Sequence, residues 1–128
     1  MSAKILYIED NQDNLALVER AMKAAGYQFV GAEDGQSGLE AAYTALPDII
    51  LLDINLPDID GYEIARRLRA SKKPGLVYTP IIAITANAMH GDAAKAIAAG
   101  CDVYMSKPIN IRELWARVEG MLHSREAV

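Results

Sequence analysis

The chain has 128 residues, of which 52% are hydrophobic and only 6% aromatic, so we expect one domain whose core of Ala, Ile, Leu and Val suits helices packed on a sheet. Its formal charge of -4 and pI near 5.1 offer no long-range attraction for nucleic acid. No apolar run approaches the roughly 20 residues needed to cross a bilayer, and the N-terminus lacks the pattern of a signal peptide. We therefore expect a cytoplasmic protein that contacts neither nucleic acid nor membrane, and its single cysteine, Cys101, permits no internal disulfide.

Short apolar segments alternate with segments of helical periodicity along the chain. The apolar segments predict five strands, at residues 4–8, 27–32, 49–53, 80–85 and 101–105. The helical spacing predicts five helices, at residues 15–25, 37–46, 62–68, 88–99 and 111–122. Residues 11–14 offer capping side chains before the first helix, and residues 71–79 are expected to form a loop. The fourth helix consists mostly of small residues, so we expect it to pack loosely and to be able to move.

This alternation predicts an α/β fold, because right-handed crossovers then give a doubly wound parallel sheet of five strands, flanked by five helices on its two faces. We expect a single domain over residues 1–128, with its core at about 4–122 and no output domain. In such folds the carboxyl ends of the strands share one edge of the sheet, where ligands bind. The polar residues that end strands one, three, four and five therefore converge: Glu9 and Asp10, Asp53, Thr85 and Lys107.

Asp53 ends an unbroken apolar run, Ile49–Leu52, and is followed by a segment of turn-forming residues. Taken alone, it could be no more than the residue at which a strand ends. Beside Glu9 and Asp10, however, its carboxylate would be repelled unless a cation neutralised the cluster. Oxygen ligands at a partly open edge favour Mg²⁺, so we assign Asp10 and Asp53 as metal ligands, with Glu9 acting through a bound water.

Other polar residues have simpler interpretations. His90, in the fourth predicted helix, and His123, near the C-terminus, are expected at the surface, so we find no support for a zinc site. Arg66, Arg67 and Arg69 are interpreted as the solvated face of the third helix.

The predicted edge has the parts needed for phosphoryl transfer. A metal-bound carboxylate beside a lysine can attack phosphorus and form an acyl phosphate, with Asp53 as the nucleophile. Lys107 and Mg²⁺ would stabilise charge on the phosphoryl oxygens. Thr85 can donate its hydroxyl to one of these oxygens, which would link the modification to the helix that follows it.

From Lys4 to Leu122 the chain resembles the receiver domain of two-component response regulators. The motifs that carry the resemblance are Glu9-Asp10, the stretch Leu-Leu-Asp-Ile-Asn-Leu-Pro-Asp-Ile-Asp-Gly around Asp53, Thr85-Ala86 and Lys107-Pro108. Glu9 stands where many members have Asp, an exchange that the family often shows. The resemblance implies a flavodoxin-like fold with strand order 2-1-3-4-5, and a cis peptide bond between Lys107 and Pro108.

The resemblance also implies roles for the site residues. Asp53 would accept a phosphoryl group from a phosphohistidine on a sensor histidine kinase or a histidine phosphotransfer protein. Mg²⁺ would be held by Asp10, Asp53 and the main-chain carbonyl of Asn55. Thr85 and Tyr104 would rearrange as the switch. Such a protein is a phosphorylated signalling protein, with at most self-catalysed phosphorylation and dephosphorylation, rather than an enzyme.

Three further segments, 9–11, 85–89 and 91–92, resemble receivers attached to hybrid sensor kinases and stand-alone receivers. We therefore expect a stand-alone receiver that signals by binding a partner protein. The family's usual signalling surface is the face formed by the fourth helix, the fifth strand and the fifth helix, with Tyr104 at its centre. The resemblance is compatible with a monomer or with a dimer that forms on phosphorylation.

Three other functions are less consistent with the sequence than a phosphorylated receiver. An aspartate-nucleophile phosphohydrolase needs a second acid two residues after the nucleophile, where this chain has Asn55. A flavin-binding domain needs a loop rich in Gly, Ser or Thr after the first strand, whereas Glu9 and Asp10 there would repel phosphate. A receiver-like binding module that works without phosphorylation is disfavoured because all five site residues are present.

Overall fold

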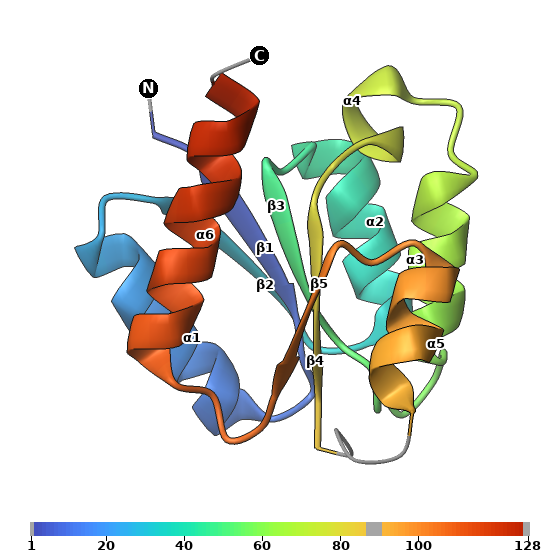
Figure 1. Ribbon diagram of the computed structural model, residues 1–128, viewed down its shortest axis with the longest axis horizontal. Coiled ribbons are helices and arrows are strands. Elements are labelled where there is room, and N and C mark those ends of the chain that lie inside the picture. Colours follow the sequence, from blue (N-terminus) through green and yellow to red (C-terminus); the bar gives the residue numbers. More distant parts are fainter. Residues whose placement is uncertain (1, 87–90, 127–128) are drawn as a thin grey trace.

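A five-stranded parallel sheet forms the centre of the molecule, seen here in a computed structural model that describes residues 2–86 and 91–126 (Figure 1). The strands are β1 (Lys4–Ile8), β2 (Gln28–Ala32), β3 (Ile49–Asp53), β4 (Ile81–Thr85) and β5 (Val103–Ser106). They lie in the order β2-β1-β3-β4-β5, and every pairing is parallel. The predicted α/β fold class and the strand order implied by the resemblance are therefore confirmed.

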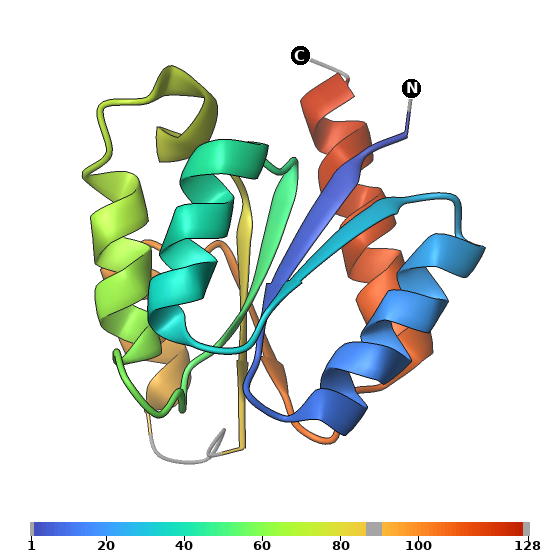
Figure 2. The same cartoon turned by 180° about the vertical axis from the view of Figure 1, so that it is seen from behind.

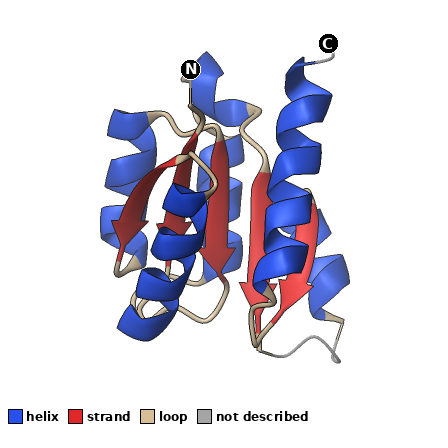
Figure 3. Ribbon diagram, turned by 90° about the vertical axis from the view of Figure 1, so that its left-hand side faces the viewer, coloured by secondary structure: helices blue, strands red, loops and turns tan. Residues whose placement is uncertain are grey.

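Helices cover both faces of the sheet (Figures 2 and 3). They are α1 (Gln12–Ala24), α2 (Gly35–Ala45), α3 (Gly61–Arg69), α4 (Pro74–Val77), α5 (Asp92–Ala99) and α6 (Ile111–Glu126). Helices α1 and α6 pack on one face, and α2, α3 and α5 pack on the other, each pair of layers enclosing its own cluster of buried apolar side chains. Among the described residues, no helix has the length and apolarity to cross a membrane.

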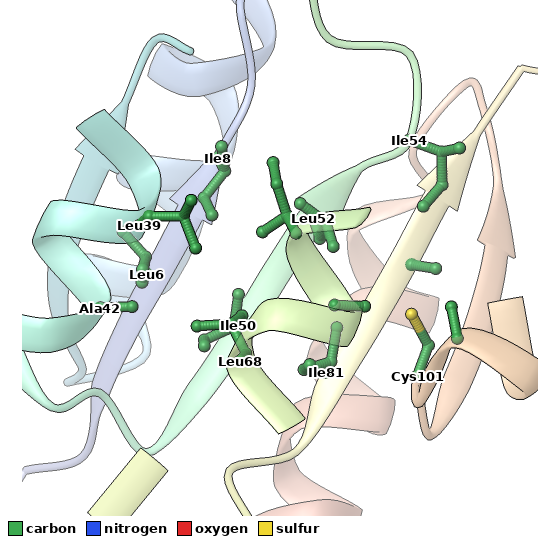
Figure 4. Close-up of a cluster of buried hydrophobic side chains, with 14 of the residues drawn as sticks. Leu6, Ile8, Leu39, Ala42, Ile50, Leu52, Ile54, Leu68, Ile81 and Cys101 are labelled. Carbon is green, nitrogen blue, oxygen red and sulfur yellow. The ribbon is translucent and has the colours of Figure 1, made fainter. Parts of the chain in front are cut away.

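The strands β3 and β4 are buried at every position, as expected for central strands covered on both faces. Figure 4 shows part of the core on the α2 and α3 side, where side chains of β1 and β3 meet those of both helices. Because Asp53 is the last residue of β3, this packing fixes the backbone from which its side chain projects.

Residues 2–86 and 91–126 form six helices, whereas five were predicted for the chain. Residues 71–79 were expected to form a loop, but α4 forms one short turn within them. Its Pro74 stands in the first helical turn, where a missing N–H is tolerated, and Leu76 is fully buried. The fourth and fifth predicted helices are therefore α5 and α6. The start of the fourth predicted helix, at residues 88–90, lies outside the described residues, as does His90.

Helix α2 begins at Gly35, two residues earlier than predicted, because two carboxylates accept its first N–H groups. Asp34 Oδ1 accepts the N–H of Ser37 at 2.8 Å, as an N-cap does. Asp58, from the loop after β3, accepts the N–H groups of Gly35 and Gln36 at 2.8 and 3.0 Å. These hydrogen bonds lower the pKa of Asp58 below its ordinary value, and they tie the β3–α3 loop to the start of α2.

Two of the three arginines of α3 lie on a solvated face, as predicted. Arg66 and Arg67 form ion pairs with Glu63 at 3.2 and 3.0 Å, and their side chains are about half exposed. Pairs of this kind contribute little to stability because water competes with them.

Arg69 is different, and its interpretation as a solvated residue is wrong. Its Nε donates to the carbonyl of Gly100 at 2.8 Å, and its Nη1 donates to the carbonyls of Val77 and Thr79 at 3.1 and 2.6 Å. Its Nη2 lies 2.7 Å from Asp102 Oδ2, and only 22% of the side chain is exposed. Arg69 therefore joins α3 to the segment before β4 and to the end of α5.

Candidate functional site

Three acidic side chains meet at the carboxyl edge of the sheet, toward which all the strand arrows point in Figure 3. Glu9 and Asp10 follow β1, and Asp53 ends β3. Each offers one carboxylate oxygen, and these oxygens lie within 4.8 Å of one another. Glu9 and Asp53 are almost completely buried, whereas Asp10 is exposed. In the part of the chain that the structure describes, this is the only cluster of three or more side chains able to hold a metal ion.

Lys107 brings a positive charge to this cluster from the segment after β5. Its Nζ lies 2.9 Å from Glu9 Oε1 and 3.4 Å from Asp53 Oδ2. Its main-chain N–H donates to the carbonyl of Thr85 at 2.8 Å, and its peptide bond to Pro108 is cis, as the resemblance implied. Although burial opposes it, the hydrogen bond to Glu9 and the charge of Asp53 raise the pKa of Lys107, so its side chain stays an ammonium.

Glu9 is held by hydrogen bonds that converge on one of its two oxygens. Its Oε1 accepts from Tyr7 Oη at 3.1 Å and from Asn14 Nδ2 at 2.9 Å, in addition to the contact with Lys107. Its Oε2 is buried and has no hydrogen-bond partner within residues 2–86 and 91–126. Although burial opposes it, hydrogen bonds with Asp53, Lys107 and Asn14 lower the pKa of Glu9 to about 2. Glu9 is therefore a buried carboxylate anion.

Asp53 is the acid whose ionisation this setting opposes. Burial and its close contact with Glu9 raise the pKa of Asp53 to about 7. The N–H of Asn55, which donates to Asp53 Oδ1 at 3.0 Å, and the charge of Lys107 act in the other direction. Three carboxylates thus share one lysine, and the described side chains leave the cluster short of positive charge.

The two residues assigned to a switch lie on the neighbouring strands. Thr85 is fully buried at the end of β4, one residue beyond Ile84, the residue that pairs with Asp53. Tyr104 lies on the edge strand β5 opposite Ala83, and its half-buried ring packs against the core on the α2, α3 and α5 side. Thr85 therefore belongs to the edge that carries the acids, and Tyr104 lies further along β5.

Tyr7 and Asn14 were not predicted to belong to the site. Asn14 was grouped with the capping residues of the first helix, and the cap itself forms: Asn11 Oδ1 accepts the N–H of Asn14 at 2.9 Å. The side chain of Asn14 instead reaches Glu9. A tyrosine within a strand that is otherwise apolar was the available signal, because a buried phenol hydroxyl usually finds a hydrogen-bond partner. His123 lies at the surface, as predicted, 3.7 Å from Glu119.

Comparisons with known proteins agree with this geometry. The family described as response regulator receiver domain matches residues 5–119. The chain is 36% identical to the polar-differentiation response regulator DivK of Brucella ovis over 111 residues, which are 87% of this chain and 89% of DivK. It is 36% identical to the alkaline phosphatase synthesis transcriptional regulatory protein PhoP of Bacillus subtilis over 126 residues, which are 98% of this chain but about half, 51%, of PhoP.

Among solved structures, the receiver domain of the sensor histidine kinase PA1611 from Pseudomonas aeruginosa PAO1 superposes with a TM-score of 0.86 and 34% identity. The match covers 96% of this chain and 99% of that one, and that structure has a magnesium ion coordinated in its active site cleft. Since the family match takes in nearly the whole sheet and its acidic edge, the chain belongs to the family of response regulator receiver domains.

Proposed function

We propose that Asp53 accepts a phosphoryl group from a phosphohistidine on a sensor histidine kinase or a histidine phosphotransfer protein, in a Mg²⁺-dependent reaction. The observation that carries this proposal is the setting of Asp53, which is 1% exposed, lies within a cluster of three acids and has an ammonium 3.4 Å from its Oδ2. Neighbouring carboxylates favour the binding of a cation. A lysine that faces the same carboxylate can stabilise the negative charge of a phosphoryl group attached to it.

The donor set fits Mg²⁺. It consists of oxygen atoms, it has fewer positive charges than carboxylates, and Glu9 Oε2 is buried with no donor among the described side chains. Asp10, Asp53 and the main-chain carbonyl of Asn55 would hold the ion, with Glu9 acting through a bound water. When bound, Mg²⁺ would neutralise charge on the phosphoryl oxygens. The magnesium in the PA1611 receiver supports this assignment by likeness.

The chain's own groups divide the work of transfer. A carboxylate oxygen of Asp53 attacks phosphorus as the bond from phosphorus to the histidine nitrogen breaks, which gives an acyl phosphate. The N–H of Asn55 holds Oδ1 and so orients the carboxylate. Lys107, already facing Oδ2, would pair with the transferred group.

The switch is proposed to pass from Thr85 to Tyr104. Thr85 would turn its hydroxyl toward the phosphoryl group, and Tyr104 would change its packing against the core beside α5. The carbonyl of Thr85 already accepts the N–H of Lys107. A movement of Thr85 at the end of β4 would therefore be transmitted to the segment that follows β5. The face formed by α5, β5 and α6 would then bind a partner protein, and it would also be the face through which two phosphorylated copies pair.

The protein is proposed to hold its phosphoryl group rather than to turn over a substrate. Two residues after Asp53 stands Asn55, which is exposed and cannot donate a proton as a general acid. Any loss of the phosphoryl group would be self-catalysed hydrolysis. Purified protein given Mg²⁺ and a phosphomonoester should therefore show no sustained phosphate release, and continued turnover would support the phosphohydrolase alternative instead.

Labelling with acetyl phosphate and Mg²⁺, followed by intact-mass spectrometry, tests the acceptor. The wild type should gain one phosphoryl group and Asp53→Asn should gain none. Asp13→Asn, which removes an acid from the first turn of α1, is the matched control and should be labelled like the wild type. Equal labelling of Asp53→Asn and the wild type would rule out Asp53 as the acceptor.

A further inference from the structure

We propose that Tyr7 and Asn14 are positioning residues that set which oxygen of Glu9 serves the phosphoryl-transfer site and that allow Lys107 to leave Glu9. This inference rests on the proposed function of Asp53. It adds two residues outside the acidic cluster whose effect passes through Glu9 alone.

The two oxygens of the Glu9 carboxylate are used unevenly. Donors from three separate parts of the chain meet at Oε1: Tyr7 in β1 at 3.1 Å, Asn14 in α1 at 2.9 Å and Lys107 after β5 at 2.9 Å. No N–H group or hydroxyl of the described chain reaches Oε2, although this atom is buried. A buried polar atom without a partner is rare in folded proteins unless it serves a ligand or a water. The donors on Oε1 therefore leave Oε2 as the oxygen available to a cation-bound water.

The position of Tyr7 in β1 directs its hydroxyl toward Glu9. Tyr7 is fully buried on the side of the sheet that α1 and α6 cover, and side chains two residues apart in a strand point to the same side. The side chains of Tyr7 and Glu9, two residues apart, therefore lie on the same side of the sheet, where the Tyr7 hydroxyl reaches Glu9 Oε1. A phenol hydroxyl carries its own proton and a carboxylate can only accept, so Tyr7 is the donor of this hydrogen bond and Glu9 Oε1 is the acceptor.

Tyr7 and Asn14 also bear on the proposed movement of Lys107. Its Nζ is nearer to Glu9 than to Asp53, at 2.9 against 3.4 Å, so pairing with a phosphoryl group on Asp53 draws it away from Glu9. If Lys107 were the sole donor to Oε1, this step would strand a fully buried carboxylate oxygen. With Tyr7 and Asn14 in place, Oε1 keeps two donors after Lys107 leaves.

Mg²⁺ affinity, measured by isothermal titration calorimetry on the intact chain, tests the inference. Tyr7→Phe and Asn14→Ala should each weaken Mg²⁺ binding about tenfold, the lower end of what loss of an outer hydrogen-bond partner does to a metal site. Tyr27→Phe is the matched control. It removes another buried tyrosine hydroxyl, at the opposite edge of the sheet, and should leave the affinity unchanged.

A double-substitution cycle separates positioning from a general effect on packing. In a Glu9→Asp background the shorter side chain no longer reaches the two donors, so adding Tyr7→Phe should change Mg²⁺ affinity less than twofold. Acetyl phosphate labelling should slow in the single variants and follow the same pattern. Unchanged Mg²⁺ affinity in both Tyr7→Phe and Asn14→Ala, or an equal loss in both backgrounds, would overturn the inference while wild-type labelling of Asp53 leaves the proposed function standing.

Discussion

Replacing Arg69 by alanine should destabilise the fold more than any other surface substitution on α3. The guanidinium donates to three main-chain carbonyls and pairs with Asp102, and 78% of the side chain is removed from solvent, since 22% is exposed. Hydrogen bonds from a charged group contribute about 1.5–3 kcal/mol each, but neighbouring ones are not additive. The ion pair with Asp102, which is about half exposed, adds at most about 1 kcal/mol. We therefore expect the free energy of unfolding to fall by about 3 kcal/mol.

Urea unfolding followed by the fluorescence of Trp115, the only tryptophan, measures this change. The loss should lower the melting temperature by roughly 10 °C for a chain of this size. Arg66→Ala is the matched control, because Arg66 pairs with Glu63 on the solvated face and its loss should change stability by less than about 0.5 kcal/mol. If Arg69→Ala and Arg66→Ala unfold at the same urea concentration, the contacts of Arg69 do not stabilise the fold and the reasoning fails.

Three more substitutions test the loop after β3 and the switch. Asp58→Asn should lower stability by about 1 kcal/mol, because Asp58 accepts two N–H groups at the start of α2, one on each oxygen, and asparagine keeps only one acceptor oxygen. Since folding lowers the pKa of Asp58, its contribution is present above the ordinary aspartate pKa of about 3.9 and is lost as the pH falls through the folded-state pKa, so urea unfolding of the two proteins should converge in acid. Gly61→Ala should weaken Mg²⁺ binding in calorimetry, because a Cβ there would lie 2.6 Å from Ile54 Cα and 2.8 Å from the carbonyl of Asp53, and normal binding would show that the loop is not so constrained. Lys107→Ala should still be labelled on Asp53, but the amide NMR signals of α5 should no longer shift on labelling; an undiminished shift would remove Lys107 from the switch.

The fold could be predicted where many consecutive residues follow one hydrophobic pattern. It was predicted less well where the contacts of one or two residues determine the local structure. The buried runs of β3 and β4 identify central strands from their sequence alone. The helix α4 was missed because its four residues contain a proline and a glycine, which are typical of loops. Its Leu76 is fully buried, a tertiary contact that the sequence pattern does not reveal. Arg69 was misjudged for the same kind of reason. Nothing in the sequence separates it from Arg66, since its carbonyl partners lie on segments that only folding brings to it.

The acidic cluster followed from topology, because residues that end parallel strands must share an edge. The hydrogen bond from Asn14 to Glu9 could not be predicted in this way, because Asn14 could equally have been a capping residue. It is Asn11, three residues earlier, that forms the cap. The contact between Asn14 and Glu9 depends on the angle at which α1 leaves β1, which a sequence pattern does not specify.

In the described chain the two ends of helix α5 are held unequally, and this difference bears on the direction of the proposed switch. At its C-terminal end the carbonyl of Gly100 accepts from Arg69, and the main-chain N–H of Gly100 closes the helix on Ile97. At its N-terminal end Gly91 supplies no side-chain cap, and the chain leads there from Thr85. Among the described residues, side-chain contacts hold α5 only at its C-terminal end, so its N-terminal end is the one expected to respond more. A change that starts at Thr85 would therefore displace the beginning of α5 while Arg69 keeps its end in register with α3, so that the face beside Tyr104 tilts rather than detaches.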